Sequence, residues 1–165
     1  MSVSIVTGVG PRTGTSFVMC RARDAGMPVS GDRFPASTVP KHNPDGYWET
    51  DPRDIHALDN TVAKLWGQSI ASVGNARISR LLVLERENKD EQIESMRRVL
   101  KDELMLAENA EYAGIAVDSS DILSEFVRNM DKWLSGIEHQ KILRVQTRDL
   151  SSRIGEVLRF LKGGL

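Results

Sequence analysis

The sequence predicts an α/β protein in three layers, with a mostly parallel sheet of about four to five strands and helices on both faces. Short apolar runs rich in Val, Ile and Leu alternate with segments whose apolar residues recur at helical spacing. This alternation is typical of strands joined by helical crossovers, which build a parallel sheet covered on both sides. At 165 residues the chain is long enough for one core, so we expect a single domain over residues 1–165.

The first strand and the first helix are predicted within the first 25 residues. Residues 3–6 are a β-rich run, Gly and Pro break it at 8–11, and residues 15–25 carry helical spacing up to Gly26. A junction of strand, tight loop and helix leaves backbone N–H groups unpaired at the positive end of the helix dipole. We therefore expect this loop to bind a phosphate or a sulfate.

The middle of the chain predicts a second strand, a long loop, a helix and a central strand. Residues 27–30 form a short apolar run, and residues 34–50 are rich in Pro, Ser, Asn and Gly without any period, which predicts a surface loop. Residues 51–65 predict a helix, because Asp51 can cap it and apolar residues follow at helical spacing. These apolar residues are Ile55, Leu58, Val62 and Leu65. Residues 68–77 are weakly patterned, and residues 78–84 resemble a buried parallel strand.

The last part of the chain predicts two further strands and three helices. Asn88, with Glu91 three residues later, predicts a capped helix start. Residues 112–117 are a possible strand, and a helical apolar stripe runs from 122 to 134. Residues 142–145 predict the last strand, and residues 154–161 predict a helix that Gly163 and Gly164 end.

Spacing in the first loop argues against two common nucleotide loops. A Walker A loop needs Gly, four residues, then Gly-Lys-Ser/Thr, but Thr15 follows Gly14 and Val9 stands at the first glycine position. The glycines at 8, 10 and 14 are one residue too widely spaced for the dinucleotide motif G-x-G-x-x-G.

Three patches in the first third of the chain resemble sulfotransferases. Residues 11–16, Pro-Arg-Thr-Gly-Thr-Ser, match the 5′-phosphosulfate loop P-[KR]-[ST]-G-[ST]-[ST] of that family at each position. Residues 43–49, Asn-Pro-Asp-Gly-Tyr-Trp-Glu, resemble the N-P-x-G-Y-W-E segment of bacterial sulfotransferase-family proteins, and residues 25–32 resemble their second strand and acidic turn. The resemblance implies a P-loop-like sulfotransferase fold and 3′-phosphoadenosine 5′-phosphosulfate (PAPS) as the sulfuryl donor. The acceptor would be a hydroxyl or amine of a small molecule or carbohydrate.

The resemblance also implies roles for particular residues. Thr13, Gly14, Thr15 and Ser16 would hold the 5′-phosphate, and Arg12 would bind it and neutralise charge on the leaving oxygen. Arg86 and Ser95 would bind the 3′-phosphate. A carboxylate near the sulfur would accept the proton of the acceptor. The first candidate for this base is Asp32, which ends the second predicted strand beside the loop, and Glu49 and His42 follow.

The chain also departs from the family pattern. Arg86 is followed by Glu87 and Asn88 where the family has R-D-P, and no K-D-P-R strand is found between residues 66 and 80. Two alternatives to a sulfotransferase therefore stay open. One is a degenerate sulfotransferase-fold module that binds a nucleotide without catalysis, and the other is a P-loop kinase, which Thr15 in place of lysine disfavours.

Composition gives further expectations about ligands and location. The net charge of −1 gives no electrostatic reason to expect nucleic acid or an anionic membrane surface as partners. Cys20 is the only cysteine, which we expect to be buried, and the three histidines are scattered, so we expect no metal site. No leader-like segment and no apolar run of about 18 residues is found, which predicts a cytoplasmic location. The oligomeric state is not predicted.

Overall fold

Four parallel strands form the sheet in the computed structural model, which describes residues 2–33, 43–73, 77–99 and 119–163. In chain order the strands are β1 (Val3–Gly8), β2 (Thr61–Lys64), β3 (Ile78–Glu85) and β4 (Ile142–Gln146). Their order in the sheet is β2-β1-β3-β4, so β1 and β3 lie in the centre. The α/β class and the parallel sheet predicted from the sequence are confirmed.

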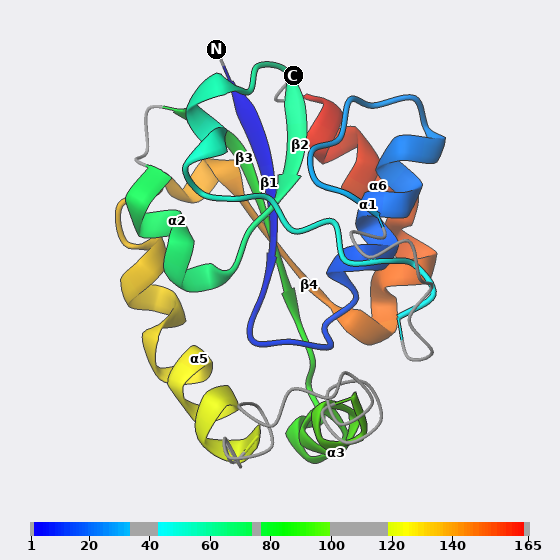
Figure 1. Cartoon of the computed structure of the whole chain (residues 1–165), viewed down its shortest axis with the longest axis vertical. Coiled ribbons are helices and arrows are strands. Elements are labelled where there is room, and N and C mark those ends of the chain that lie inside the picture. The colour runs from blue at the N-terminus through cyan, green and yellow to red at the C-terminus, as the bar shows by residue number, and fades with distance from the viewer. Residues whose placement is uncertain (1, 34–42, 74–76, 100–118, 164–165) are drawn as a thin grey trace.

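Helices cover both faces of this sheet (Figure 1). Helices α2 (Gly67–Val73) and α5 (Ser119–Leu134) lie on one side, and α1 (Thr15–Asp24) and α6 (Leu150–Lys162) lie on the other. Helix α3 (Lys89–Val99) follows β3 and lies beyond the carboxyl end of the sheet. None of the helices within the described ranges has the length and apolar character needed to cross a membrane.

Alternation along β1 divides the apolar residues into two cores. Ile5 packs with α5 residues such as Phe126, whereas Val6 packs with Val18 of α1 and Leu161 of α6. Because successive side chains of a strand point to opposite faces, a strand with helices on both sides is apolar at nearly every position. Burial of both faces explains why the short runs in the sequence are continuous rather than alternating.

The helix predicted over residues 51–65 is wrong. Asp51 does cap a turn, since its Oδ1 accepts a hydrogen bond from the Arg53 backbone N–H at 2.9 Å. The helical part is only a 3₁₀ helix, Asp54–Ala57, and Asn60 then takes a left-handed φ of 49° before β2 begins. Val62 is buried inside β2 because this strand pairs along its whole length with β1. The apolar residues between 55 and 65 therefore do not belong to one helix. Their helical spacing arose because a strand buried on both faces follows a short 3₁₀ helix.

Other boundaries differ in smaller ways. The predicted strand at 27–30 is reduced to one bridge between Val29 and Val62 at the outer edge of β2. Helix α2 occupies the segment that the sequence left unassigned. Asn88 caps α3 as predicted, because its Oδ1 accepts the Glu91 N–H at 3.1 Å. The possible strand at 112–117 lies outside the described residues.

The order of the strands places a crevice between β1 and β3. After β1 the chain passes through α1 to β2 on one side, whereas after β3 it continues to β4 on the other side. Ligands of open parallel sheets bind where neighbouring strands send their connections in opposite directions, outside the carboxyl ends. The predicted anion loop follows β1 at this point.

Candidate functional site

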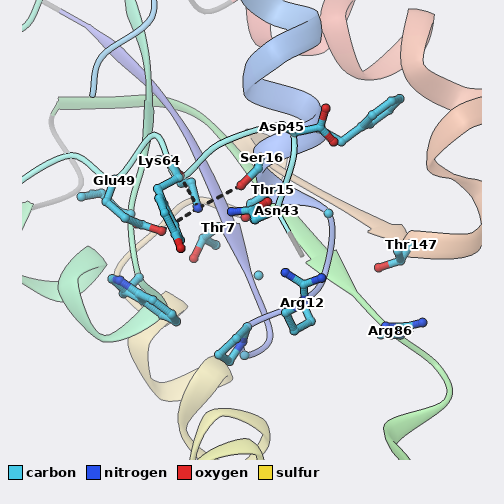
Figure 2. Close-up of a pocket in the computed structure, with 18 of the residues that line it drawn as sticks. Thr7, Arg12, Thr15, Ser16, Asn43, Asp45, Glu49, Lys64, Arg86 and Thr147 are labelled. Atoms are coloured by element: carbon cyan, nitrogen blue, oxygen red, sulfur yellow. Dashed lines mark hydrogen bonds and ion pairs between the residues drawn. The ribbon is translucent and has the colours of Figure 1, made fainter. Parts of the chain in front are cut away.

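A cavity of about 460 Å³ opens at the carboxyl ends of the strands (Figure 2). Its walls come from the end of β1, the loop before α1, the residues after β2 and β3, and the segment around residues 43–49. Residues that line it include Thr7, Arg12, Thr15, Ser16, Glu49, Lys64, Trp66, Arg86 and Thr147. The two patches with the strongest resemblance, residues 11–16 and 43–49, therefore meet at one cavity.

The backbone of the first loop has an unusual conformation beside this cavity. Gly10, Arg12 and Gly14 all have positive φ, at 83°, 65° and 91°. Alternation between left-handed and right-handed residues makes a concave array of N–H groups that suits an anion. Gly14 precedes α1 without a side-chain cap, so the first N–H groups of the helix have no acceptor within it. The loop thus has the backbone features of an anion site.

Gly14 has a second reason to be glycine. A Cβ on Gly14 would lie 3.1 Å from Leu150 Cδ2, so its missing side chain faces α6. Gly14 is thus needed for its positive φ and for packing under the loop, and it leaves the cavity side of the loop to Thr15 and Ser16.

Three side chains stabilise the loop by donating hydrogen bonds to its backbone carbonyls. Gln92 of α3 is fully buried, and its Nε2 donates to the Val9 carbonyl at 2.9 Å and to the Pro11 carbonyl at 2.6 Å. Thr147, after β4, donates to the Thr13 carbonyl at 2.8 Å. Thr13 itself is buried and its Oγ1 bonds the Gly10 carbonyl at 3.4 Å. These bonds fix the loop before any ligand arrives, which is what a preorganised anion site requires.

Lys64 is the central cation of the cavity. It is the last residue of β2, and its Nζ lies 2.6 Å from Glu49 Oε1, 2.5 Å from the Tyr47 carbonyl and 3.3 Å from Ser16 Oγ. Its side chain is only 10% exposed. A parallel bridge between Glu49 and Lys64 sets the two residues side by side. Lys64 therefore connects the segment around Glu49 with the start of α1.

Burial shifts the pKa values of this pair toward the neutral forms. Desolvation raises the pKa of Glu49, and the nearby Lys64 ammonium opposes this shift. Desolvation likewise lowers the pKa of Lys64, against the attraction of Glu49. A carboxyl with a raised pKa is a better proton acceptor than an exposed one, and a partly desolvated ammonium interacts strongly with an arriving anion.

Two arginines lie on the other side of the cavity. Arg12 donates from Nε to Ser95 Oγ at 3.1 Å, so Ser95 of α3 holds the Arg12 side chain in place. Arg86 follows β3, lines the cavity and lies 3.3 Å from Glu91 Oε2. The structure thus brings Arg12, Arg86 and Ser95 to the same side of the loop. Ser95 does not line the cavity, and its contact is with Arg12.

The structure separates the candidates for the base. Glu49 lines the cavity, whereas Asp32 is exposed and is not among the lining residues. The backbone carbonyl of Asp32 accepts the Trp48 N–H at 3.1 Å, so this residue anchors the segment that carries Glu49. His42 lies outside the described residues. Of the three candidates, Glu49 is the one that the described part of the chain brings to the cavity.

Sequence reasoning missed Lys64, Thr7, Gln92 and Thr147. Lys64 and Thr7 could have been found by asking which polar residues end an apolar strand, because those positions meet at the carboxyl edge of a parallel sheet. No local signal marks Gln92 or Thr147, whose partners lie 62 to 134 residues away in the chain.

The described residues contain no group of three or more metal-ligating side chains. Comparisons of the chain with known protein families, with curated proteins and with solved structures find no match. The cavity thus places the cationic side chains of Lys64, Arg12 and Arg86 beside a carboxylate, that of Glu49, whose pKa is raised by burial.

Proposed function

We propose that this protein transfers a sulfuryl group from PAPS to a hydroxyl or amine acceptor, a small molecule or a carbohydrate. One observation carries the proposal: the loop that resembles a 5′-phosphosulfate loop, and that includes Arg12, shares a cavity with Lys64 and the carboxylate of Glu49. A transferase of this kind needs an anion cradle, a cation at the leaving oxygen and a base at the acceptor.

Each group has a part in the proposed reaction. The N–H groups at the start of α1, with Thr15 and Ser16, bind the 5′-phosphate of the donor. Glu49 accepts the proton while the acceptor oxygen or nitrogen bonds to sulfur. The bond between sulfur and the 5′-phosphate oxygen breaks, and its electron pair stays on that oxygen, where Lys64 and Arg12 stabilise the negative charge. Lys64 is suited to this task because its ammonium already contacts both Ser16 and Glu49.

Arg86 supports the choice of a 3′-phosphorylated nucleotide. It lines the cavity after β3, on the opposite side of the loop from Lys64 in Figure 2. Its ion pair with Glu91 is partly exposed, so a phosphate can compete for the guanidinium. Adenosine carrying 3′- and 5′-phosphates would then engage both sides of the cavity.

A binding experiment tests the donor without knowledge of the acceptor. Adenosine 3′,5′-bisphosphate, the product that PAPS leaves behind, should stabilise the protein more than AMP or ATP. At about 100 times its dissociation constant a ligand adds roughly 2.7 kcal/mol, which should raise Tm by about 5–10 °C in a domain of this size. Arg86→Ala should remove the preference over AMP, whereas Arg98→Ala, on the exposed face of α3, should keep it.

The other outcomes separate the alternatives. A larger shift with ATP and Mg²⁺ would favour a kinase, and equal shifts from the bisphosphate and AMP would remove the 3′-phosphate site. Strong binding of the bisphosphate, with no transfer from labelled PAPS in a broad acceptor screen, would favour the non-catalytic nucleotide-binding module. The cytoplasmic location stays a prediction from the sequence.

A further inference from the structure

The hydroxyl of Thr7 is buried in the wall of the cavity without a hydrogen-bond partner. Thr7 is 0% exposed and lines the cavity. Its Oγ1 contacts no hydrogen-bonding atom in residues 2–33, 43–73, 77–99 and 119–163. Figure 2 shows this side chain in the cavity that Lys64, Glu49 and Arg12 also line. An unpaired buried hydroxyl is uncommon and calls for an explanation, because such groups are nearly always satisfied.

Several other hydroxyls on or near the sheet are satisfied by backbone carbonyls. On the same strand, Ser4 Oγ donates to the Leu161 carbonyl at 2.9 Å. Ser79 on β3 donates to the Val3 carbonyl at 3.0 Å, and Thr147 bonds the Thr13 carbonyl. Thr7 therefore differs from these residues because its hydroxyl has no backbone carbonyl of the described residues as partner and its side chain lies in the wall of a cavity.

Position within the cavity suggests which ligand atom the hydroxyl meets. The 5′-phosphate is assigned above to the start of α1, and the acceptor to Glu49. Thr7 belongs to neither of these elements, since it is the second-to-last residue of β1, close to the loop. The group in transfer must lie between the leaving oxygen and the acceptor, because the displacement is in line. The wall of the cavity at the end of β1 is where a donor to that group is needed.

We propose that Thr7 Oγ1 donates a hydrogen bond to an oxygen of the transferred sulfuryl group. This inference rests on the proposed function, because it assigns a contact within the same reaction. The sulfuryl oxygens carry negative charge in the donor, and a fixed neutral hydrogen-bond donor binds them without reorganisation. Thr7 is then a catalytic residue, and its unpaired state without ligand is the cost of that preorganisation.

The test compares two buried threonines whose hydroxyls have no partner in the described part of the chain, and of which only Thr7 lines the cavity. Thr50 is also buried with an unpartnered Oγ1 among the described residues, but it does not line the cavity. Thr7→Val and Thr50→Val each replace a hydroxyl by a methyl group of similar size. Neither change should lower Tm of the ligand-free protein, because no hydrogen bond is lost and a buried unpaired hydroxyl is removed.

Binding of PAPS and of adenosine 3′,5′-bisphosphate then reports on the sulfuryl group alone. Thr7→Val should weaken PAPS binding on the order of 10-fold or more, as expected for a lost hydrogen bond to a charged group, and leave bisphosphate binding unchanged. Thr7→Ser should retain the preference for PAPS, and Thr50→Val should behave like the wild type. Isothermal titration without acceptor measures both affinities.

Each contrary result identifies what has failed. If Thr7→Val lowers Tm of the ligand-free protein by several degrees, the hydroxyl has a structural partner and the inference is overturned. If the wild type binds PAPS but Thr7→Val binds it equally well, the Thr7 contact is wrong while the proposed function stands. If the wild type binds neither nucleotide, the proposed function itself has failed, and the Thr7 assignment fails with it.

Discussion

Replacement of Lys64 by methionine tests the pair at the centre of the cavity. Lys64→Met keeps the unbranched apolar part of the side chain but removes three polar contacts, to Glu49, Tyr47 and Ser16. Removing one member of a buried ion pair typically costs about 3–5 kcal/mol, since the other charge stays buried. The Glu49 side chain is 35% exposed and its pKa is raised, so it can be hydrated or protonated. We therefore expect a smaller loss of about 1–3 kcal/mol.

A double-mutant cycle separates the pair from other effects of the substitution. That loss corresponds to a fall in Tm of about 2–10 °C, measurable by urea or thermal unfolding followed by circular dichroism. Because Lys64→Met/Glu49→Gln leaves no charge unpaired, it should recover at least half of the lost stability. Lys141→Met breaks a more exposed pair with Glu138 and should change stability by less than about 0.5 kcal/mol. Strictly additive effects of the two single changes would refute the coupling that the 2.6 Å contact implies.

Three further predictions concern Arg12, Glu49 and Asp32, the residues given roles in the proposed reaction or considered for its base. Arg12→Ala should lower the transfer rate by about 10²–10³-fold with Tm almost unchanged, and an unaltered rate constant would remove Arg12 from the mechanism. Glu49→Gln should reduce kcat strongly and Asp32→Asn only slightly, so steady-state rates showing the reverse order would return the base to Asp32. The raised pKa of Glu49 means that its contribution to the free energy of unfolding is full below its ordinary value of 4.5 and is lost as pH rises through the folded pKa. When the free energy of unfolding is measured from pH 4 to pH 8, it should therefore fall in the wild type relative to Glu49→Gln. If the two proteins show the same dependence of this free energy on pH, the raised pKa of Glu49 is contradicted.

The sequence alone determined those features that depend on neighbouring residues. The break after β1, the start of α1 and the cap of α3 at Asn88 all follow from dihedral preferences and hydrogen bonds within about one turn. The central strands β1 and β3 were also predicted, because a strand covered on both faces is a continuous apolar run. The class of the fold follows from the alternation of these local elements.

Tertiary structure decided which of these residues act together. Residues 61–64 became a strand because they pair with β1, and this pairing outweighs the helical spacing of Val62 and Leu65. Lys64 meets Ser16 across 48 residues of sequence, and sheet register, rather than local preference, brings them together. Pairing also explains why Glu49, rather than Asp32, lines the cavity. Glu49 forms a parallel bridge with Lys64, the last residue of β2, and this bridge holds the Glu49 side chain beside Lys64. Contacts of this kind depend on the closing of long loops and on the packing of whole layers, for which a single sequence carries no periodic signal.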